Sequence, residues 1–385
     1  MRRPAGPHVA ARMEDRFDQL LGRLMRRQGW SPVVTASTGY ADNDGVHVFV
    51  RVLLGPPMPG DRAAGHRWRW RWETRRARPP RGWRSLIALP APGTPVTVTV
   101  GERQHTLTAE RGGYVHAELP MVLVPGWHEA IVAVDGREPV ACRVRAVDPR
   151  GERGVISDID DTIVVTWVPR PLLAAWNTFI LREKARRPVP GMGELLRALA
   201  GEDGFVFYLS TGAWNFAPHL ERFMTEHGLP PGPLLLSDWG PTPSGWFRSG
   251  ATHKRDMLER LRREHPSARW TLVGDDGQHD PQIYADFAAA HPHAVHAVAI
   301  RRLSAAQQVL ASGTPSAPPT PQSTSGARAT DPMAPAARAH PLPWVTGSDG
   351  YELLAALRGA GALRIIFGLT VNNPRRSGAT DGRTE

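Results

Sequence analysis

Three carboxylates and a hydroxyl follow a short apolar run in this chain, as Asp158, Asp160, Asp161 and Thr162. Carboxylates this close together repel one another and raise each other's pKa, so a cation should lie among them. A hard divalent ion such as Mg²⁺ takes oxygen ligands and keeps open positions for water and a substrate phosphate. The spacing therefore predicts the nucleophile loop of a metal-assisted phosphotransferase. The alternative is an acidic turn that caps the next helix, although a cap needs one such residue rather than three.

Polar groups also follow two later apolar segments. Ser210, Thr211 and Gly212 come directly after the run 205–209, and the acidic stretch 274–280 follows 270–273. Ligands of open parallel sheets bind beyond the carboxyl ends of the strands, so we expect these groups to meet at one edge. The sequence thus predicts one composite site made of several loops.

A lysine completes the set. The chain holds 47 basic residues, of which only Lys184 and Lys254 are lysines. A compact ammonium suits a point contact with a phosphoryl oxygen, where a planar guanidinium would not fit as well. We therefore include Lys254, at the start of a predicted helix, in the candidate site, and chance is the alternative explanation.

These residues need a parallel sheet to position them, and the hydropathy pattern predicts one. From residue 154 onward, apolar strands alternate with helices, which is typical of an α/β fold. The predicted strands are 155–156, 205–209, 234–236, 270–273 and 295–300, with helices at 192–200 and 218–227 between them. A further helix at 171–184 would form a small lid above the site. We place the catalytic domain at 151–303.

The first 150 residues predict a different architecture. An amphipathic helix within 1–30 is expected to dock on the region that follows, because its polar face mixes both charge signs. From 31 to 150, short alternating strands separated by Gly, Pro and Asp-Gly turns predict an all-β, sandwich-like accessory domain, with an open barrel as the alternative. Within it, the segment 62–84 holds nine arginines and four tryptophans. It predicts either an edge strand packed through its tryptophans or a surface for an anionic membrane or nucleic acid.

After the catalytic domain, residues 304–343 predict a disordered linker, because 311–343 contains eight prolines and no aromatic residue. Residues 344–385 predict one more helix, docked on the α/β domain, and a polar tail. Cys142, the only cysteine, excludes an intrachain disulfide and is expected in the core of the accessory domain.

The overall charge points to an anionic partner. The formal net charge is +10 and the pI is near 10.7, which favours a phosphorylated substrate, an anionic lipid surface or nucleic acid. No apolar run approaches the roughly 18 residues of a spanning helix, and the N-terminus lacks the apolar core of a signal peptide. We therefore expect a cytoplasmic protein without a transmembrane segment, with peripheral membrane association as an option.

Two motifs together resemble a known family. The stretch Asp158-Ile159-Asp160-Asp161-Thr162 and the loop Gly274-Asp275-Asp276-Gly277-Gln278-His279-Asp280-Pro281 are similar to the catalytic domain of the actin-patch-associated phosphatidate phosphatases. These belong to the haloacid dehalogenase superfamily. The resemblance covers about residues 152–303 and implies a Rossmann-like parallel sheet of that superfamily's type.

The resemblance also implies a role for each residue. Asp158 would attack phosphorus and become an aspartyl-phosphate, and Asp160 would protonate the leaving oxygen and then activate water. Mg²⁺ would be held by Asp158, the backbone carbonyl of Asp160, and Asp275. Thr162, Ser210, Thr211 and Gly212 would contact the substrate, and Lys254 would stabilise the charge of the transition state.

Some assignments within the motifs stay open. Asp280 is expected in an indirect or water-mediated metal role, and Asp276 competes with Asp275 for the direct contact. His253 and His279 lie beside motif residues, where they would either touch substrate or serve as a helix cap and a solvated turn. The family commonly has Ser-x-Ser-Pro-Trp after the second strand, whereas this chain has Gly212 in place of the second serine.

The sequence therefore predicts a Mg²⁺-dependent phosphomonoester phosphatase, with phosphatidate as the substrate implied by the resemblance. One alternative is a phosphatase of a soluble phosphorylated metabolite. Another is a non-catalytic adaptor that binds a membrane or nucleic acid. A pure binding module would have no use for so costly a cluster of charges, and we regard nucleic acid as an unlikely partner.

Overall fold

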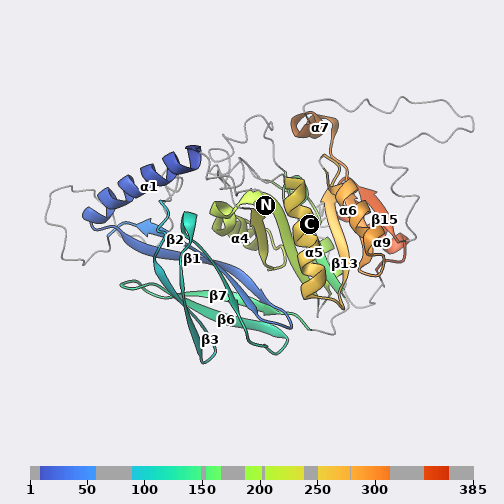
Figure 1. Ribbon diagram of the computed structural model, residues 1–385. Coiled ribbons are helices and arrows are strands. Elements are labelled where there is room, and N and C mark those ends of the chain that lie inside the picture. Colours follow the sequence, from blue (N-terminus) through green and yellow to red (C-terminus); the bar gives the residue numbers. More distant parts are fainter. Residues whose placement is uncertain are drawn as a thin grey trace, which may run out of the picture.

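The computed structural model describes residues 9–57, 89–148, 153–165, 187–201, 204–237, 250–277, 279–312 and 342–363. Within them lie a mostly antiparallel seven-stranded sheet and a parallel six-stranded sheet with helices on both faces (Figure 1). The predicted Arg/Trp segment at 62–84 and the predicted lid at 171–184 fall outside the described residues. Among the described helices, none is both long and apolar enough to cross a membrane.

The N-terminal helix α1 spans Val9–Arg27. Leu21 and Met25 pack against the core of the first sheet, whereas Leu20 and Leu24 stay exposed to 65% and 50%. The helix therefore docks on the region that follows it, as its charge pattern predicts.

The accessory region is one continuous sheet. Its strands are β1 (Ser31–Ala41), β2 (Val46–Gly55), β3 (Pro95–Val100), β4 (Arg103–Thr108), β5 (Tyr114–Leu119), β6 (Gly126–Ala133) and β7 (Val140–Ala146), in the spatial order β4-β3-β6-β7-β1-β2-β5. All neighbours are antiparallel except β1 and β7. The sheet bends until its two edges approach each other, and Arg103 of β4 donates to the carbonyl of Pro120 just after β5, at 3.0 Å. This nearly closed barrel replaces the predicted sandwich, because the strands pair into one sheet instead of two.

Alternating valines fill the inside of this barrel-like sheet. Val46, Val48, Val50 and Val52 of β2 are all buried, as expected when every second side chain faces the core. Cys142 lies in the same core, as predicted, and burial raises the pKa of its thiol to about 12. The thiol is therefore a packing group rather than a nucleophile.

The turn between β1 and β2 is held by Asp42. Its carboxylate accepts from the backbone N–H groups of Asp44 and Gly45, each at 2.8 Å, and lies 3.0 Å from Nε2 of His47. Burial alone would raise the pKa of Asp42, but these hydrogen bonds outweigh it and lower the pKa to about 2. The ionised carboxylate therefore stabilises the folded state at neutral pH.

Replacing Asp42 with alanine is expected to lower the free energy of unfolding at pH 7 by about 2 kcal/mol. Because the folded pKa lies below the unfolded one, this stabilisation is present above about pH 4 and is lost as the pH falls toward 2. Urea unfolding at pH 7 and pH 2.5 would measure the difference. Asp44→Ala, at an exposed position of the same turn, is the matched control. An equal loss at both pH values would contradict the prediction.

The second sheet carries the parallel α/β pattern that the sequence predicts. Its strands are β8 (Arg153–Asp158), β11 (Phe205–Ala213), β12 (Leu234–Ser237), β13 (Arg269–Asp275), β14 (Val295–Arg301) and β15 (Trp344–Gly347), in the order β12-β11-β8-β13-β14-β15. All of them run parallel. The five predicted strands are confirmed, and β15 adds a sixth strand that was not predicted. Two short strands, β9 (Val164–Val165) and β10 (Arg187–Pro188), come between β8 and α3 in the sequence and pair with each other in an antiparallel manner.

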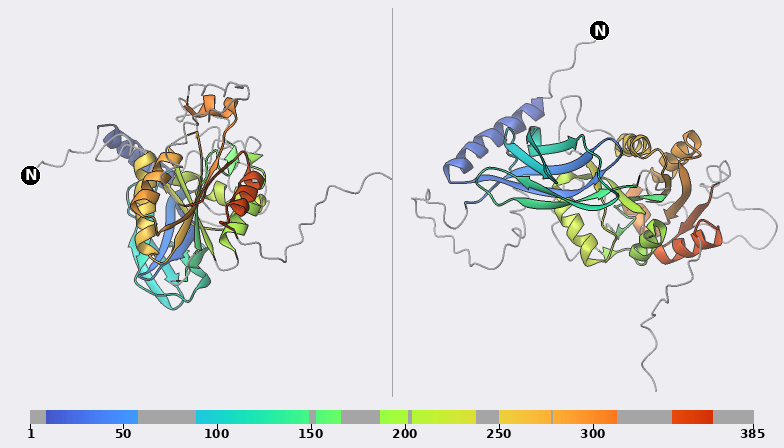
Figure 2. Two further views of the ribbon diagram at one scale, coloured as in Figure 1. Left: turned by 90° about the vertical axis from the view of Figure 1, so that its right-hand side faces the viewer. Right: turned by 90° about the horizontal axis from the view of Figure 1, so that it is seen from below.

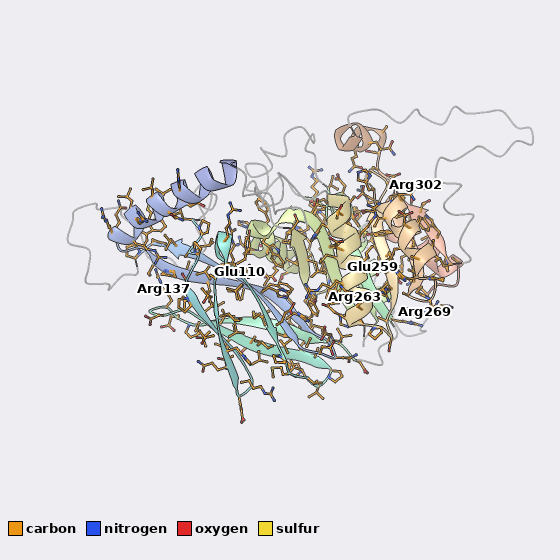
Figure 3. All side chains as sticks on the ribbon, viewed as in Figure 1. Glu110, Arg137, Glu259, Arg263, Arg269 and Arg302 are labelled. Atoms are coloured by element: carbon orange, nitrogen blue, oxygen red, sulfur yellow. The ribbon has the colours of Figure 1, made fainter. Side chains whose placement is uncertain are left out.

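Helices cover both faces of the parallel sheet (Figure 2). Apolar residues of α3 (Met192–Ala200), α4 (Ala217–Glu226) and α9 (Gly350–Gly359) share one core, and those of α5 (Gly250–Glu264) and α6 (Asp280–Ala290) share the other. The solvent side of α5 carries charged residues, including Glu259 and Arg263, which Figure 3 labels. A helix α7 (Ala305–Ser312) occupies the start of the predicted linker, most of which lies outside the described residues. The docked C-terminal helix is confirmed as α9.

Candidate active site

The central strand β8 ends at the first residue of the carboxylate motif. Asp158 is buried at the end of β8, and Ile159 and Ile163 are buried on either side of the loop. Between them, Asp161 has a φ of 57°, the left-handed region that costs a non-glycine residue free energy. Its N–H donates to the carbonyl of Val164 at 2.8 Å, which closes the turn. The loop is thus a tight turn pinned by apolar anchors.

Arg301 holds this turn from the end of β14. Its side chain is buried and donates to the carbonyl of Asp161 at 2.6 Å, to the carbonyl of Ser348 at 3.0 Å and to Oε1 of Gln307 at 3.3 Å. Three hydrogen bonds from one planar guanidinium connect the loop 158–162 to two other segments. Arg301 was not among the predicted site residues, because nothing in the neighbouring sequence distinguishes one arginine from the many others in this chain.

Lys254 reaches Asp158 from α5. Its Nζ atom lies 2.7 Å from Oδ1 of Asp158 and also contacts Oδ1 of Asp280, and all three side chains are buried. Burial would lower the pKa of Lys254, but the surrounding carboxylates outweigh it and raise the pKa above the usual range. The lysine is therefore a fixed positive charge at this site.

For Asp158, burial has the larger effect on the pKa. Burial raises the pKa of Asp158 above its usual range, Asp280 and Asp160 add to this, and Lys254 opposes it. A buried ammonium needs an ionised partner, so the contact with Lys254 is an ion pair between charged groups. Asp158 is thus a buried carboxylate held next to a buried cation.

Thr162 joins Asp158 to the acidic loop after β13. Its hydroxyl lies 3.1 Å from Oδ2 of Asp158 and 3.5 Å from Oδ2 of Asp275, and the other oxygen of Asp275 accepts from the N–H of Gly277 at 2.7 Å. Burial and the neighbouring carboxylates Asp280 and Asp158 raise the pKa of Asp275. Asp275 thus faces the loop 158–162.

The neighbouring Asp276 points elsewhere. Its carboxylate accepts from the N–H of Leu303 at 2.8 Å, in the turn before α7. The structure therefore separates the two adjacent acids that competed in the sequence, because alternation along an extended backbone sends successive side chains to opposite sides.

Asp158, Asp275 and Asp280 form a group that could hold a cation. One oxygen of each lies within 4.8 Å of the others. Oδ2 of Asp280 is buried without a hydrogen-bond partner among the described residues, so it is available as a ligand. Three carboxylates against one ammonium leave an excess of negative charge, and oxygen ligands of this kind suit Mg²⁺. The residues present fit a divalent ion.

Gly274 allows Asp280 to approach this closely. A Cβ atom at position 274 would lie 2.6 Å from Oδ2 of Asp280 and 2.8 Å from the ring of Tyr284. Only glycine leaves room for the first turn of α6 against the end of β13. The glycine in the predicted motif therefore has a packing reason.

Ser210 connects the second loop to the first. Its hydroxyl donates to Oδ2 of Asp160 at 2.8 Å and accepts from the N–H of Gly212 at 2.9 Å. The backbone carbonyl of Thr211 accepts from Ser237 at 2.6 Å, which ties the loop to β12. Asp160, Ser210 and Gly212 thus meet at the same edge of the sheet as Asp158.

Two histidines that adjoin the motifs differ in their surroundings. His253 is buried on α5 beside Lys254, whereas His279 is exposed and precedes α6 without a side-chain cap bond. His253 lies inside α5, so it is not the helix cap that was the alternative for it, whereas the solvated turn expected for His279 is confirmed.

Part of the chain is similar to a known protein family. Residues 153–302 match the family described as the catalytic domain of phosphatidate phosphatase APP1. Phosphatidate phosphatase APP1 of Saccharomyces cerevisiae is 28% identical over 150 residues, which are 38% of this chain and 25% of that protein. An uncharacterized protein of Schizosaccharomyces pombe is 28% identical over 148 residues, 38% of this chain and 24% of that protein. The family resemblance seen in the sequence is confirmed for this segment.

The matched relatives are much longer than this segment, and the chain spans about a quarter of their length. Among solved structures, a carbohydrate acetylesterase from Xanthomonas citri aligns at 10% identity with a TM-score of 0.29, over 85% of this chain and 74% of that one. A similarity of that size carries no argument about fold or function.

Proposed function

Because residues 153–302 belong to the family of APP1 phosphatidate phosphatase catalytic domains, we propose that this protein is a Mg²⁺-dependent phosphomonoester phosphatase. The observation that carries the proposal is the convergence of four side chains from three segments of the chain: Asp158 at the end of β8, Lys254 on α5, and Asp275 and Asp280 of the stretch 274–280. Lys254 lies 2.7 Å from Asp158, and the three carboxylates offer oxygens within 4.8 Å of one another. We also propose that the α/β domain is of the haloacid dehalogenase type, which its strand order and loop positions support.

In this proposal Asp158 is the nucleophile. One of its oxygens attacks phosphorus and the bond from phosphorus to the alcohol oxygen breaks, which leaves an aspartyl-phosphate. Asp160 gives its proton to the departing oxygen and then takes one from the water that hydrolyses the intermediate. Its hydrogen bond with Ser210 keeps Asp160 oriented near the reacting atoms. The products are the free alcohol, released in the first step, and inorganic phosphate, released in the second, which regenerates the Asp158 carboxylate.

The cationic groups make this attack feasible. Lys254, paired with Asp158, stands where charge develops on the phosphoryl oxygens and stabilises it without reorganisation. Asp158, Asp275, Asp280 and the backbone carbonyl of Asp160 would hold Mg²⁺, which supplies the positive charge that lets a phosphate approach the carboxylates. The free oxygen of Asp280 supports a more direct ligand role than the sequence suggested.

Phosphatidate is the substrate that the family resemblance favours, and we propose that the protein meets it at an anionic membrane surface in the cytoplasm. The net charge of +10 supports attraction to such a surface. A soluble phosphorylated metabolite is the competing substrate class.

Phosphate release from a substrate panel, with Mg²⁺ or with excess EDTA, tests the proposed function. The panel contains short-chain phosphatidate, glycerol 3-phosphate, sugar phosphates and nucleotides. We expect release from phosphatidate with Mg²⁺ and a loss of at least about a hundredfold with EDTA, since the ion balances the carboxylates. Faster release from a soluble ester would contradict the lipid assignment. A protein that hydrolyses none of these substrates would contradict the phosphatase assignment itself.

A further inference from the structure

The accessory region contacts the elements that carry the candidate site. Phe49 of β2 stacks on Trp214 of the catalytic domain, with ring centroids 5.0 Å apart and an interplanar angle of 24°. His116 of β5 stacks on Phe49 in turn, at 4.6 Å and 15°. Three rings thus form a continuous stack across the interface, and each pair contributes about 0.5–1.5 kcal/mol beyond the area that it buries.

Trp214 lies directly after the loop that contains Ser210. It begins the short helix η5 (Trp214–Phe216), which follows β11 without a gap. Only four positions separate Trp214 from Ser210, whose hydroxyl bonds Asp160. A displacement of the tryptophan ring would therefore move the backbone next to the proposed acid.

The same loop packs against the start of α5. A Cβ atom at Gly250 would lie 2.6 Å from Cγ2 of Thr211, so the loop and the helix touch at close range. Lys254 is one turn further along this helix. A shift of the loop would therefore also change the position of the Lys254 ammonium that pairs with Asp158.

The accessory region also holds the far end of α5. Tyr40 donates to Oε2 of Glu264 at 2.7 Å, and Arg260 lies 3.2 Å from Nδ1 of His47. On α4, Oε1 of Glu221 accepts from the N–H of Thr38 at 2.7 Å. Contacts from the segment 38–49 thus reach α4, α5 and the end of β11. Figure 1 shows β1 and β2, in blue, extending to this side of the α/β sheet.

A metal is not needed to explain this interface. His47, His116 and Glu118 place possible ligand atoms within 4.8 Å of one another. The guanidinium of Arg260, however, lies 3.2 Å from Nδ1 of His47 and 3.5 Å from Oε1 of Glu118. The chain's own cation is the partner there, so the cluster is a structural contact between the two regions.

We propose that Phe49 is a positioning residue for the reaction, because its stack on Trp214 fixes the Ser210 loop relative to Asp160. The accessory region is then part of the catalytic unit and not a separate binding module. This inference rests on the proposed function. A misplacement of about 1 Å at a reacting group can lower a rate by about a hundredfold, so a contact remote from the substrate can control turnover.

Substitutions that remove or keep the ring test the inference in the full chain. With Mg²⁺ and saturating substrate, Phe49→Leu is expected to lower kcat about tenfold with KM within about twofold. Phe49→Tyr, which keeps the ring, should restore most of kcat. Tyr114→Leu is the matched control, because Tyr114 lies on the same sheet and its ring is paired with Arg51 at 5.0 Å.

A double-mutant cycle locates the effect. Trp214→Leu should match Phe49→Leu, and the double variant should be no slower than either one, because both remove the same contact. A kcat for Phe49→Leu within twofold of the parent, or a loss that Tyr114→Leu reproduces, would overturn the inference.

Hydrogen exchange separates this inference from the proposed function. Peptides that cover 205–216 should exchange at least about threefold faster in Phe49→Leu than in the parent or in Tyr114→Leu, whether or not the protein hydrolyses any substrate. Unchanged exchange there would refute the positioning role. Faster exchange in a protein with no phosphatase activity would keep the structural contact and reject the enzymatic role that we assign to it.

Discussion

Asp158→Asn is expected to lower the rate of phosphate release by roughly a thousandfold or more while the protein stays folded. Asparagine keeps the size of the side chain, yet its amide cannot attack phosphorus as a carboxylate does. Asp280 still pairs with Lys254 in this variant and one of three mutually repelling acids is removed, so we expect a thermal midpoint close to that of the parent. Initial rates with Mg²⁺ and a thermal melt of each protein would measure both effects.

Asp276→Asn is the matched control for this experiment. Asp276 belongs to the acidic loop, but its carboxylate accepts from Leu303 N–H, and an asparagine oxygen can do the same. Its activity should therefore stay within about twofold of the parent. Wild-type turnover in Asp158→Asn would exclude Asp158 as the nucleophile, and loss of activity in Asp276→Asn would reverse the assignment of the two adjacent acids.

Lys254→Met is expected to have a large effect on both activity and stability. Methionine fills a similar volume without the charge, so kcat/KM should fall by about 100- to 1000-fold as the transition-state stabilisation is lost. Asp158 and Asp280 would lose their buried cation, which costs about 3 kcal/mol when the carboxylates stay ionised.

The stability effect of Lys254→Met should depend on pH. Without the lysine, the cation that opposes the raised pKa of Asp158 is lost, so this acid binds its proton more tightly in the folded variant than in the unfolded chain. The variant therefore loses stability as the pH rises, and its deficit relative to the parent should be larger at pH 8 than at pH 5. Urea unfolding at both pH values, in EDTA, would measure this.

Arg255→Met provides the control on the same helix. Arg255 pairs with Asp286 at 3.6 Å, and about half of each side chain is exposed, so the pair should contribute little. We expect a change in unfolding free energy below about 0.5 kcal/mol and unchanged activity. If Arg255→Met and Lys254→Met behaved alike, the special role of the buried ammonium would be wrong.

Local patterns in the sequence determined where the strands and helices lie and which polar side chains follow the strands. Unbroken apolar runs alternating with helices identify a parallel sheet, and the runs that end at Asp158, Ser210 and Asp275 place polar groups at its carboxyl edge. The alternation around Cys142 likewise identified a core position. These features depend on the pattern of apolar and polar residues within about ten neighbouring positions, and this pattern can be read directly from the sequence.

The tertiary structure decided which of these groups meet. Only the fold shows that Asp276 turns to Leu303, that Asp280 leaves an oxygen free in the cluster, and that Arg301 supports the strained Asp161. Each of these facts depends on contacts between residues far apart in the chain, for which neighbouring sequence carries no periodic signal.

The accessory region illustrates the same division. Its short alternating strands were predictable, but their pairing into one nearly closed sheet and the stack of Phe49 on Trp214 were not. Strand propensity is a property of a few residues, whereas strand order and domain contact are set by which surfaces bury one another most completely. The sequence alone therefore determined which side chains are candidates for the site, and long-range packing determined how they are held.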